Sequence, residues 1–109
     1  MRPRIWSDVA LRIPRVVVRI APGPAWTSGR PEDQAGWSEH AAFINDLIDR
    51  GVFIMGGPWT NRLGSMSLWE GMDAEEVRRV QETDPFVVNG VFEIEEIADW
   101  TVYVDTRVE

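Results

Sequence analysis

Four segments with the composition of β-strands alternate with two segments of helical periodicity, and this order is the strongest constraint on the fold. The strand-like segments are β-branched or continuously apolar, or they alternate polar and apolar residues. The helix-like segments carry apolar residues three and four positions apart. In chain order, the strand-like segments span residues 15–20, 52–55, 65–70 and 91–95, and the helix-like segments span residues 36–50 and 73–83.

Residues that start and stop helices mark the boundaries. Gly51 follows Arg50 and is typical of a residue that ends a helix. Asp73, with Glu76 three residues on, is the aspartate version of a capping box. Asp84-Pro85 predicts the end of the second helix, because a residue before proline avoids the helical region.

The remaining stretches are expected to connect or flank these elements. Residues 1–13 read as an irregular leader before a domain at 14–109, and residues 21–36 as a long loop. Residues 86–90 predict a tight loop. Residues 100–105 alternate polar and apolar side chains, so they either extend the last strand or pair with another subunit.

The order strand–helix–strand–strand–helix–strand is the ferredoxin-like pattern of the α+β class. It predicts an antiparallel four-stranded sheet with two helices on one face, and 109 residues suffice for one such domain. Positions 16–18 and 52–55 are apolar on both alternations, so the second face of the sheet is apolar too. Because an apolar face exposed to water is costly, we expect two copies to pack face to face.

Composition excludes several classes of function. The net charge of −7 argues against nucleic acid and anionic membranes as partners. All 11 basic residues are Arg, which excludes a Schiff-base lysine, and the absence of Cys excludes thiol nucleophiles. A single His makes a multi-histidine metal site implausible, so no metal or cofactor is expected. With no apolar run of spanning length and no signal-peptide pattern, we expect a cytoplasmic protein.

The topology places His40 and Asp84 at the same edge of the sheet. With right-handed crossovers, the end of the first strand, the start of the first helix, the end of the second strand and the end of the second helix meet there. A carboxylate next to an imidazole orients the ring and selects its tautomer, and such a pair moves protons. His40 and Asp84 are therefore the candidate catalytic pair.

Other residues at this edge have the chemistry of a binding cleft. Gly56 and Gly57, at the end of the second strand, allow backbone to approach a ligand closely, and Pro58 follows them as a further candidate binding residue with Gly57. Arg30 has the charge to meet an anionic group. The aromatic side chains that would wall the cleft are Trp37, Trp59 and Phe86.

The ordered set of helix histidine, strand-end Gly-Pro and Asp-Pro-aromatic resembles the YCII-related family over roughly residues 14–104. The matching residues are 39–43, 47–48, 51, 56–58, 84–86 and 90–91. The resemblance implies a ferredoxin-like fold that dimerises into an α/β barrel, with His40 and Asp84 as the active dyad and Gly57-Pro58 as the strand-end motif. The leader and the loop at 21–36 are extra relative to shorter members, so a substrate class does not carry over.

Three functions are compatible with these residues. The first is a cofactor-independent lyase or isomerase, in which Asp84 orients His40 for proton transfer on a small organic acid or aromatic-derived molecule. The second is a module that binds a small ligand, or only dimerises, without catalysis. The third is a cofactor-free monooxygenase like those among the sister barrels of the family.

Overall fold

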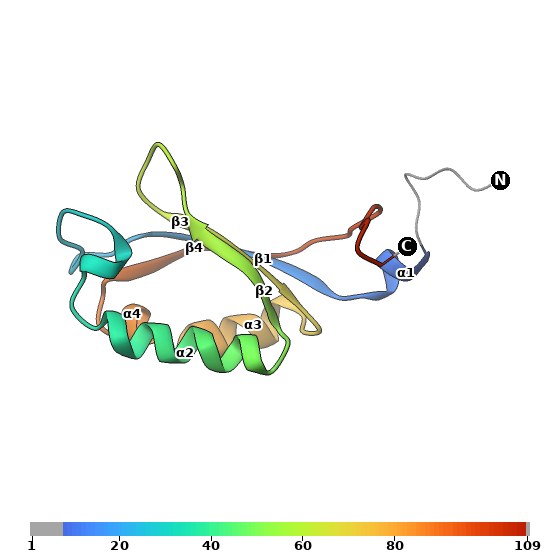
Figure 1. Ribbon diagram of the computed structural model, residues 1–109, viewed down its shortest axis with the longest axis horizontal. Coiled ribbons are helices and arrows are strands. Elements are labelled where there is room, and N and C mark those ends of the chain that lie inside the picture. The colour runs from blue at the N-terminus through green and yellow to red at the C-terminus, as the bar shows by residue number, and fades with distance from the viewer. Residues whose placement is uncertain (1–7, 109) are drawn as a thin grey trace.

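The computed structural model describes residues 8–108 (Figure 1). The strands are β1 (Arg15–Pro22), β2 (Phe53–Pro58), β3 (Ser65–Glu70) and β4 (Phe92–Asp99). The helices are α1 (Asp8–Arg12), α2 (Trp37–Asp49), α3 (Ala74–Gln81) and α4 (Pro85–Val88), with a 3₁₀ turn, η1, at Pro31–Asp33. None of the helices in this range is long and apolar enough to cross a bilayer.

The four strands form one antiparallel sheet in the order β2-β3-β1-β4. Helices α2, α3 and α4 all lie on the same side of this sheet, and the opposite side carries no helix (Figure 1). This arrangement confirms the predicted α+β, ferredoxin-like fold.

The core lies between the sheet and the helices. Val16, Val18 and Ile20 point inward from the central strand β1, where they pack with Leu47 of α2 and Val77 of α3. Each fully buried aliphatic side chain of this kind stabilises the fold by about 1.5–3 kcal/mol. The inward alternation of β1 therefore fixes which side of the sheet the helices cover.

Capping residues set the ends of the two longer helices as the sequence predicts. The Asp73 carboxylate accepts a hydrogen bond from the Glu76 backbone N–H at 2.8 Å, and the Glu76 carboxylate accepts one from the Asp73 N–H at 3.4 Å. Gly51 adopts φ +76°, the left-handed conformation that ends α2. Local chemistry thus marks the start of α3 and the end of α2.

Four segments differ from the expectation. Strand β2 continues through Gly56-Gly57-Pro58, because β2 is an edge strand, where proline needs no ladder partner. Residues 86–90 contain a short helix, α4, because Pro85 at its first position has a helical φ and Asp84 caps it. The predicted leader includes helix α1; its residues 1–7 lie outside the described range.

Residues 100–105 form no strand, and the reason lies in the partner strand. The Trp100 N–H donates to the Arg15 carbonyl at 2.8 Å, and β1 begins at Arg15, so no strand remains to pair with the following residues. The segment is instead held by ion pairs.

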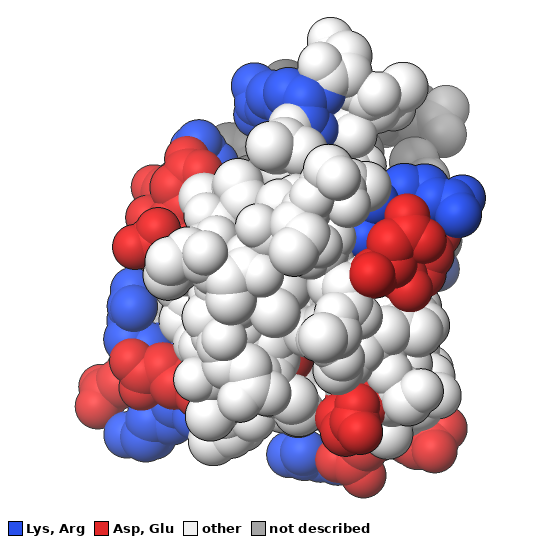
Figure 2. Space-filling view, turned by 90° about the vertical axis from the view of Figure 1, so that its left-hand side faces the viewer, with Lys and Arg blue, Asp and Glu red and all other residues white. Residues whose placement is uncertain are grey.

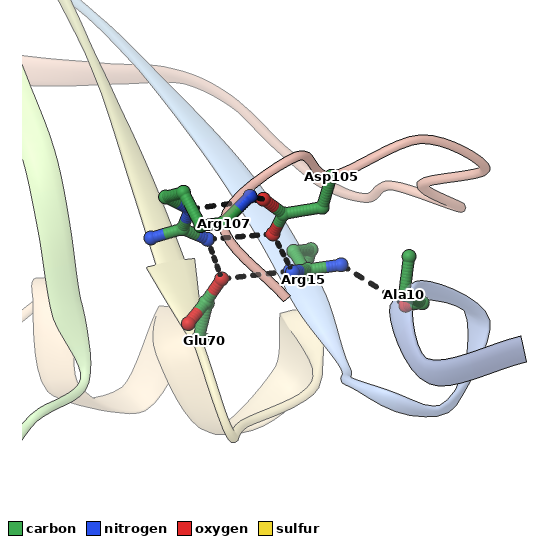
Figure 3. A network of polar contacts seen from close by, with 5 residues as sticks. All are labelled: Ala10, Arg15, Glu70, Asp105 and Arg107. Atoms are coloured by element: carbon green, nitrogen blue, oxygen red, sulfur yellow. Dashed lines mark hydrogen bonds and ion pairs between the residues drawn. The ribbon is translucent and has the colours of Figure 1, made fainter. Parts of the chain in front are cut away.

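Arg15 is the centre of this polar network (Figure 3). Its buried guanidinium donates to Glu70 at 2.8 Å and to the Ala10 carbonyl at 3.0 Å, and it also pairs with Asp105. Arg107 bridges Glu70 and Asp105 at 2.6 and 2.7 Å. Hydrogen bonds from Arg107 lower the pKa of Asp105 to about 2. The network ties α1 and the C-terminal segment to the end of the sheet that lies away from His40.

Candidate active site

His40 and Asp84 are in direct contact. His40 lies in the first turn of α2, and Asp84 lies between α3 and α4. The His40 Nδ1 atom is 2.8 Å from Asp84 Oδ1 and 3.0 Å from Asp84 Oδ2. Because a carboxylate only accepts, Nδ1 carries the proton of this hydrogen bond. The fold therefore places two residues that are 44 positions apart in the chain within hydrogen-bond distance.

The Asp84 carboxylate is held from several sides. It has no exposed surface, and its Oδ1 accepts a hydrogen bond from the Phe86 backbone N–H at 2.9 Å, which caps α4. The Gln81 side-chain amide approaches its Oδ2 at 3.4 Å. These contacts fix the carboxylate, so it can orient the imidazole without reaching solvent itself.

Aromatic side chains fix the plane of the His40 ring. Phe86 stacks on it with a centroid distance of 4.3 Å and an interplanar angle of 7°. Phe92 meets it edge-on at 5.3 Å, and Trp37 lies at 5.6 Å. The ring is thus clamped in one orientation, with Asp84 at its Nδ1 edge.

The other ring nitrogen, Nε2, is available. No hydrogen-bond partner of Nε2 exists within residues 8–108, yet every buried side-chain nitrogen and oxygen of this range has a partner. It follows that Nε2 keeps some exposed surface. His40 is one of the residues that line a cavity.

The cavity has a volume of about 490 Å³, within the range of small-molecule sites. It lies between α2 and the sheet, with lining residues from all four strands. Figure 2 shows one end of the molecule, with an uncharged centre and charged residues around its edge. The lining is mainly apolar. Besides His40 and Asp84 it includes Trp37, Ala41, Ile44, Ile48, Phe53, Gly56, Gly57, Pro58, Met66, Gln81 and Phe92.

A second cavity of about 280 Å³ contains two other predicted binding residues, Arg30 and Trp59. The Arg30 side chain is 73% exposed and pairs with Glu32 at 3.7 Å and Asp33 at 3.5 Å. Hydrogen bonds from Arg30, its backbone N–H first, lower the pKa of Asp33. Arg30 is therefore already neutralised by two neighbouring carboxylates.

The structure divides the predicted site residues into three groups. Trp37, Gly57 and Pro58 join His40 and Asp84 at the larger cavity. Arg30 and Trp59 lie at the smaller cavity, which Pro58 also lines. Phe86 is fully buried behind the imidazole, so it supports the ring and does not wall the cavity.

Sequence reasoning missed two residues next to the pair. Gln81 is a buried amide three positions before Asp84, and a polar residue on the inward side of an amphipathic helix is the signal that could have indicated it. Phe92 is the first residue of β4, and its distance from His40 in the chain gave no hint of the contact. Within the described residues, no three acidic or histidine side chains gather in a way that would hold a metal ion.

Comparison with known proteins identifies the family of the chain. The model of the YCII-related domain matches residues 15–101, from the start of β1 to just beyond β4, and so includes both members of the pair. A search of curated proteins finds no match for the chain. With the family model covering most of its length, the chain belongs to the YCII-related family.

Proposed function

We propose that this protein is a small cofactor-independent enzyme of the lyase or isomerase type, with His40 as its acid–base group. The observation that carries the proposal is that the two nitrogens of the imidazole ring have different surroundings. Nδ1 is engaged by a fully buried carboxylate at 2.8 and 3.0 Å, whereas Nε2 is left without a protein partner at an apolar cavity.

The chemistry follows from the tautomer. With its proton on Nδ1, the neutral imidazole has a lone pair on Nε2, directed at the cavity. Nε2 takes a proton from a substrate C–H bond, and the buried Asp84 carboxylate stabilises the imidazolium that forms. The electron pair of the broken C–H bond becomes part of a new double bond. In an isomerase a proton is then returned to a second carbon; in a lyase a leaving group departs as an anion and the proton goes to water.

The cavity limits the class of substrate. Its aliphatic and aromatic lining suits a small apolar or aromatic-derived body, and the burial of Asp84 strengthens the interaction between imidazolium and carboxylate. A small organic acid or lactone satisfies these conditions. The cavity also contains Glu32, so in an isomerase either His40 itself or Glu32 is the group that returns the proton.

The test is turnover of a panel of small organic acids and lactones by wild-type protein, His40→Asn and Asp84→Asn. His40→Asn keeps polarity but has no titratable nitrogen, and loss of a positioned acid–base group lowers turnover by roughly 10²–10⁴-fold. Asp73→Asn, which changes an exposed cap of α3, is the matched control and is expected to turn over at the wild-type rate. Equal turnover by His40→Asn and wild type would disprove the assignment.

A binding module without catalysis is the second candidate, and the double role of Asp84 favours it. The carboxylate caps α4 as well as holding His40, so the pair has a structural use even without a reaction. The two candidates differ in one result. A binding-only protein retains ligand affinity in His40→Asn and shows no turnover in any variant.

We further propose that the protein acts as a homodimer through the open face of the sheet. Val17, Leu68 and Met55 are register partners across three strands and point away from the helices. Met55 is 57% exposed in the single chain. A second copy packed on this face would remove the apolar strip from water.

A further inference from the structure

The two cavities adjoin each other. Five residues line both of them: Ile20, Pro31, Pro58, Ser65 and Phe92. A ligand that passes these shared residues would have one end beside His40 and the other end in the smaller cavity. The composition of the smaller cavity then bears on what the far end of the substrate is.

Arg62, in the connection between β2 and β3, lines the smaller cavity and is positioned there by an aromatic ring. Its guanidinium carbon lies 4.4 Å from the centroid of the Trp59 ring. A guanidinium stacked on an indole has a restricted orientation and keeps its N–H groups, which lie around its edge, available for a planar anion.

The connection itself has a defined shape. The Trp59 backbone N–H donates to the Gly64 carbonyl at 3.0 Å and closes the loop. Gly64 has φ +96°, and a Cβ atom there would lie 2.6 Å from the Ile20 carbonyl oxygen. Glycine thus lets the loop fold back against β1, which places Trp59, and with it Arg62, beside the shared boundary of the cavities.

Arg62 differs from Arg30 in its partners. Arg30 has Glu32 and Asp33 beside it, whereas among residues 8–108 no carboxylate pairs with Arg62. The chain carries a net charge of −7, and among the two arginines that line the smaller cavity only Arg30 is paired with a carboxylate in the described residues. Arg62 has its charge available where Arg30 does not.

We propose that Arg62, stacked on Trp59, binds the carboxylate of the substrate, and that the site therefore selects small monocarboxylates whose apolar body reaches His40. This inference rests on the proposed function for the larger cavity. One guanidinium without a carboxylate partner matches a single carboxylate, which it contacts through two parallel N–H···O bonds. A phosphate dianion would need further donors.

The test uses 3-phenylpropanoate and its neutral amide, 3-phenylpropanamide, as probes of equal shape. His40 is the only histidine, so one imidazole signal in the NMR spectrum reports on the larger cavity, and the Trp59 indole signal reports on the smaller one. Affinities are measured for wild type, Arg62→Gln and Arg30→Gln. Arg30→Gln is the matched control at the same cavity.

We expect the acid to shift both signals and to bind wild type about tenfold more tightly than the amide, as for a charge-assisted contact. Arg62→Gln removes this preference, whereas Arg30→Gln changes it by less than about twofold. An acid preference that survives in Arg62→Gln, an equal loss in both variants, or no binding of the acid at millimolar concentration would overturn the proposal.

The two signals separate this proposal from the catalytic one. If the acid shifts Trp59 and depends on Arg62 but leaves His40 unmoved, the carboxylate site stands and the proposed reaction at His40 loses support. If the acid shifts His40 and its affinity is the same in Arg62→Gln, the larger cavity binds ligand and the role of Arg62 is wrong.

Discussion

Replacing Asp84 with Ala removes the acceptor of three buried donors at once. The His40 Nδ1–H, the Phe86 backbone N–H and the more distant Gln81 side-chain amide all lose their partner. A lost helix cap costs about 1 kcal/mol, and a buried donor without its partner costs about 1–3 kcal/mol. We therefore expect Asp84→Ala to lower the free energy of unfolding by about 3 kcal/mol.

Asp73→Ala separates the two contributions. Asp73 caps α3 in the same way, through the Glu76 N–H at 2.8 Å, but it is exposed and touches no histidine. Its loss is expected to cost only about 1 kcal/mol. The excess of about 2 kcal/mol in Asp84→Ala is then the contribution of the buried contacts with His40 and Gln81.

The assay is urea unfolding followed by tryptophan fluorescence, which six Trp residues make sensitive. The free energies of the two variants are compared at equal slope m, so that a change in the unfolded state does not enter the difference. A thermal melt gives the same order, with Asp84→Ala about 10 °C below Asp73→Ala. If the two variants were destabilised equally, the predicted contribution of the buried Asp84 contacts to the free energy of unfolding would be wrong.

Three further predictions concern regions away from the pair. The pKa of Asp105 lies at about 2, below its ordinary 3.8. Its ion pairs therefore stabilise the C-terminal segment fully above about pH 3.8 and are lost as the pH falls through about 2. Hydrogen exchange of residues 100–108 measures this, and detachment of the segment centred near pH 3.8 would contradict it. Leu68→Glu, on the open face of the sheet, is expected to convert dimers into monomers in sedimentation velocity. The control Val88→Glu, at an exposed position of α4, is expected to leave the dimer intact. A monomeric wild type would refute the proposed dimer. Gly64→Ala is expected to lower the free energy of unfolding by more than about 1 kcal/mol, because φ is +96° and the new Cβ would lie 2.6 Å from a backbone oxygen of β1. A Cβ at Gly57 would meet nothing within 4 Å, so Gly57→Ala is expected to change the free energy of unfolding by less than about 0.5 kcal/mol. Thermal melts compare the two variants.

Topology explains why the contact between His40 and Asp84 could be predicted. Strand and helix periodicity, with right-handed crossovers, leaves few ways to arrange six elements. Asp84-Pro85 ended the second helix and the start of α2 carried His40, so both fell at the same edge of the sheet. The capping box at Asp73 and Gly51 needed only local chemistry, and the structure confirms both.

Contacts set by loop geometry could not be predicted in this way. Composition alone does not tell that Arg30 is neutralised by its neighbours while Arg62 is not, because both are arginines in connections. The alternation of residues 100–105 is that of a strand, but a strand also needs a partner, and β1 begins too late to provide one. Phe86 was recognised as part of the site, yet its place behind the ring depends on the helical turn at α4.

The proposed function requires that Asp84 holds the proton of neutral His40 on Nδ1 and leaves a lone pair on Nε2. The most direct measurement is the ¹⁵N NMR spectrum of the single imidazole at a pH where the ring is neutral, in wild type and in Asp84→Ala. The account predicts that wild type gives one protonated and one unprotonated nitrogen signal, with the proton on Nδ1, and that this tautomer is no longer fixed in Asp84→Ala. A wild-type ring that carries its proton on Nε2, or that exchanges between both tautomers as the variant does, would contradict it.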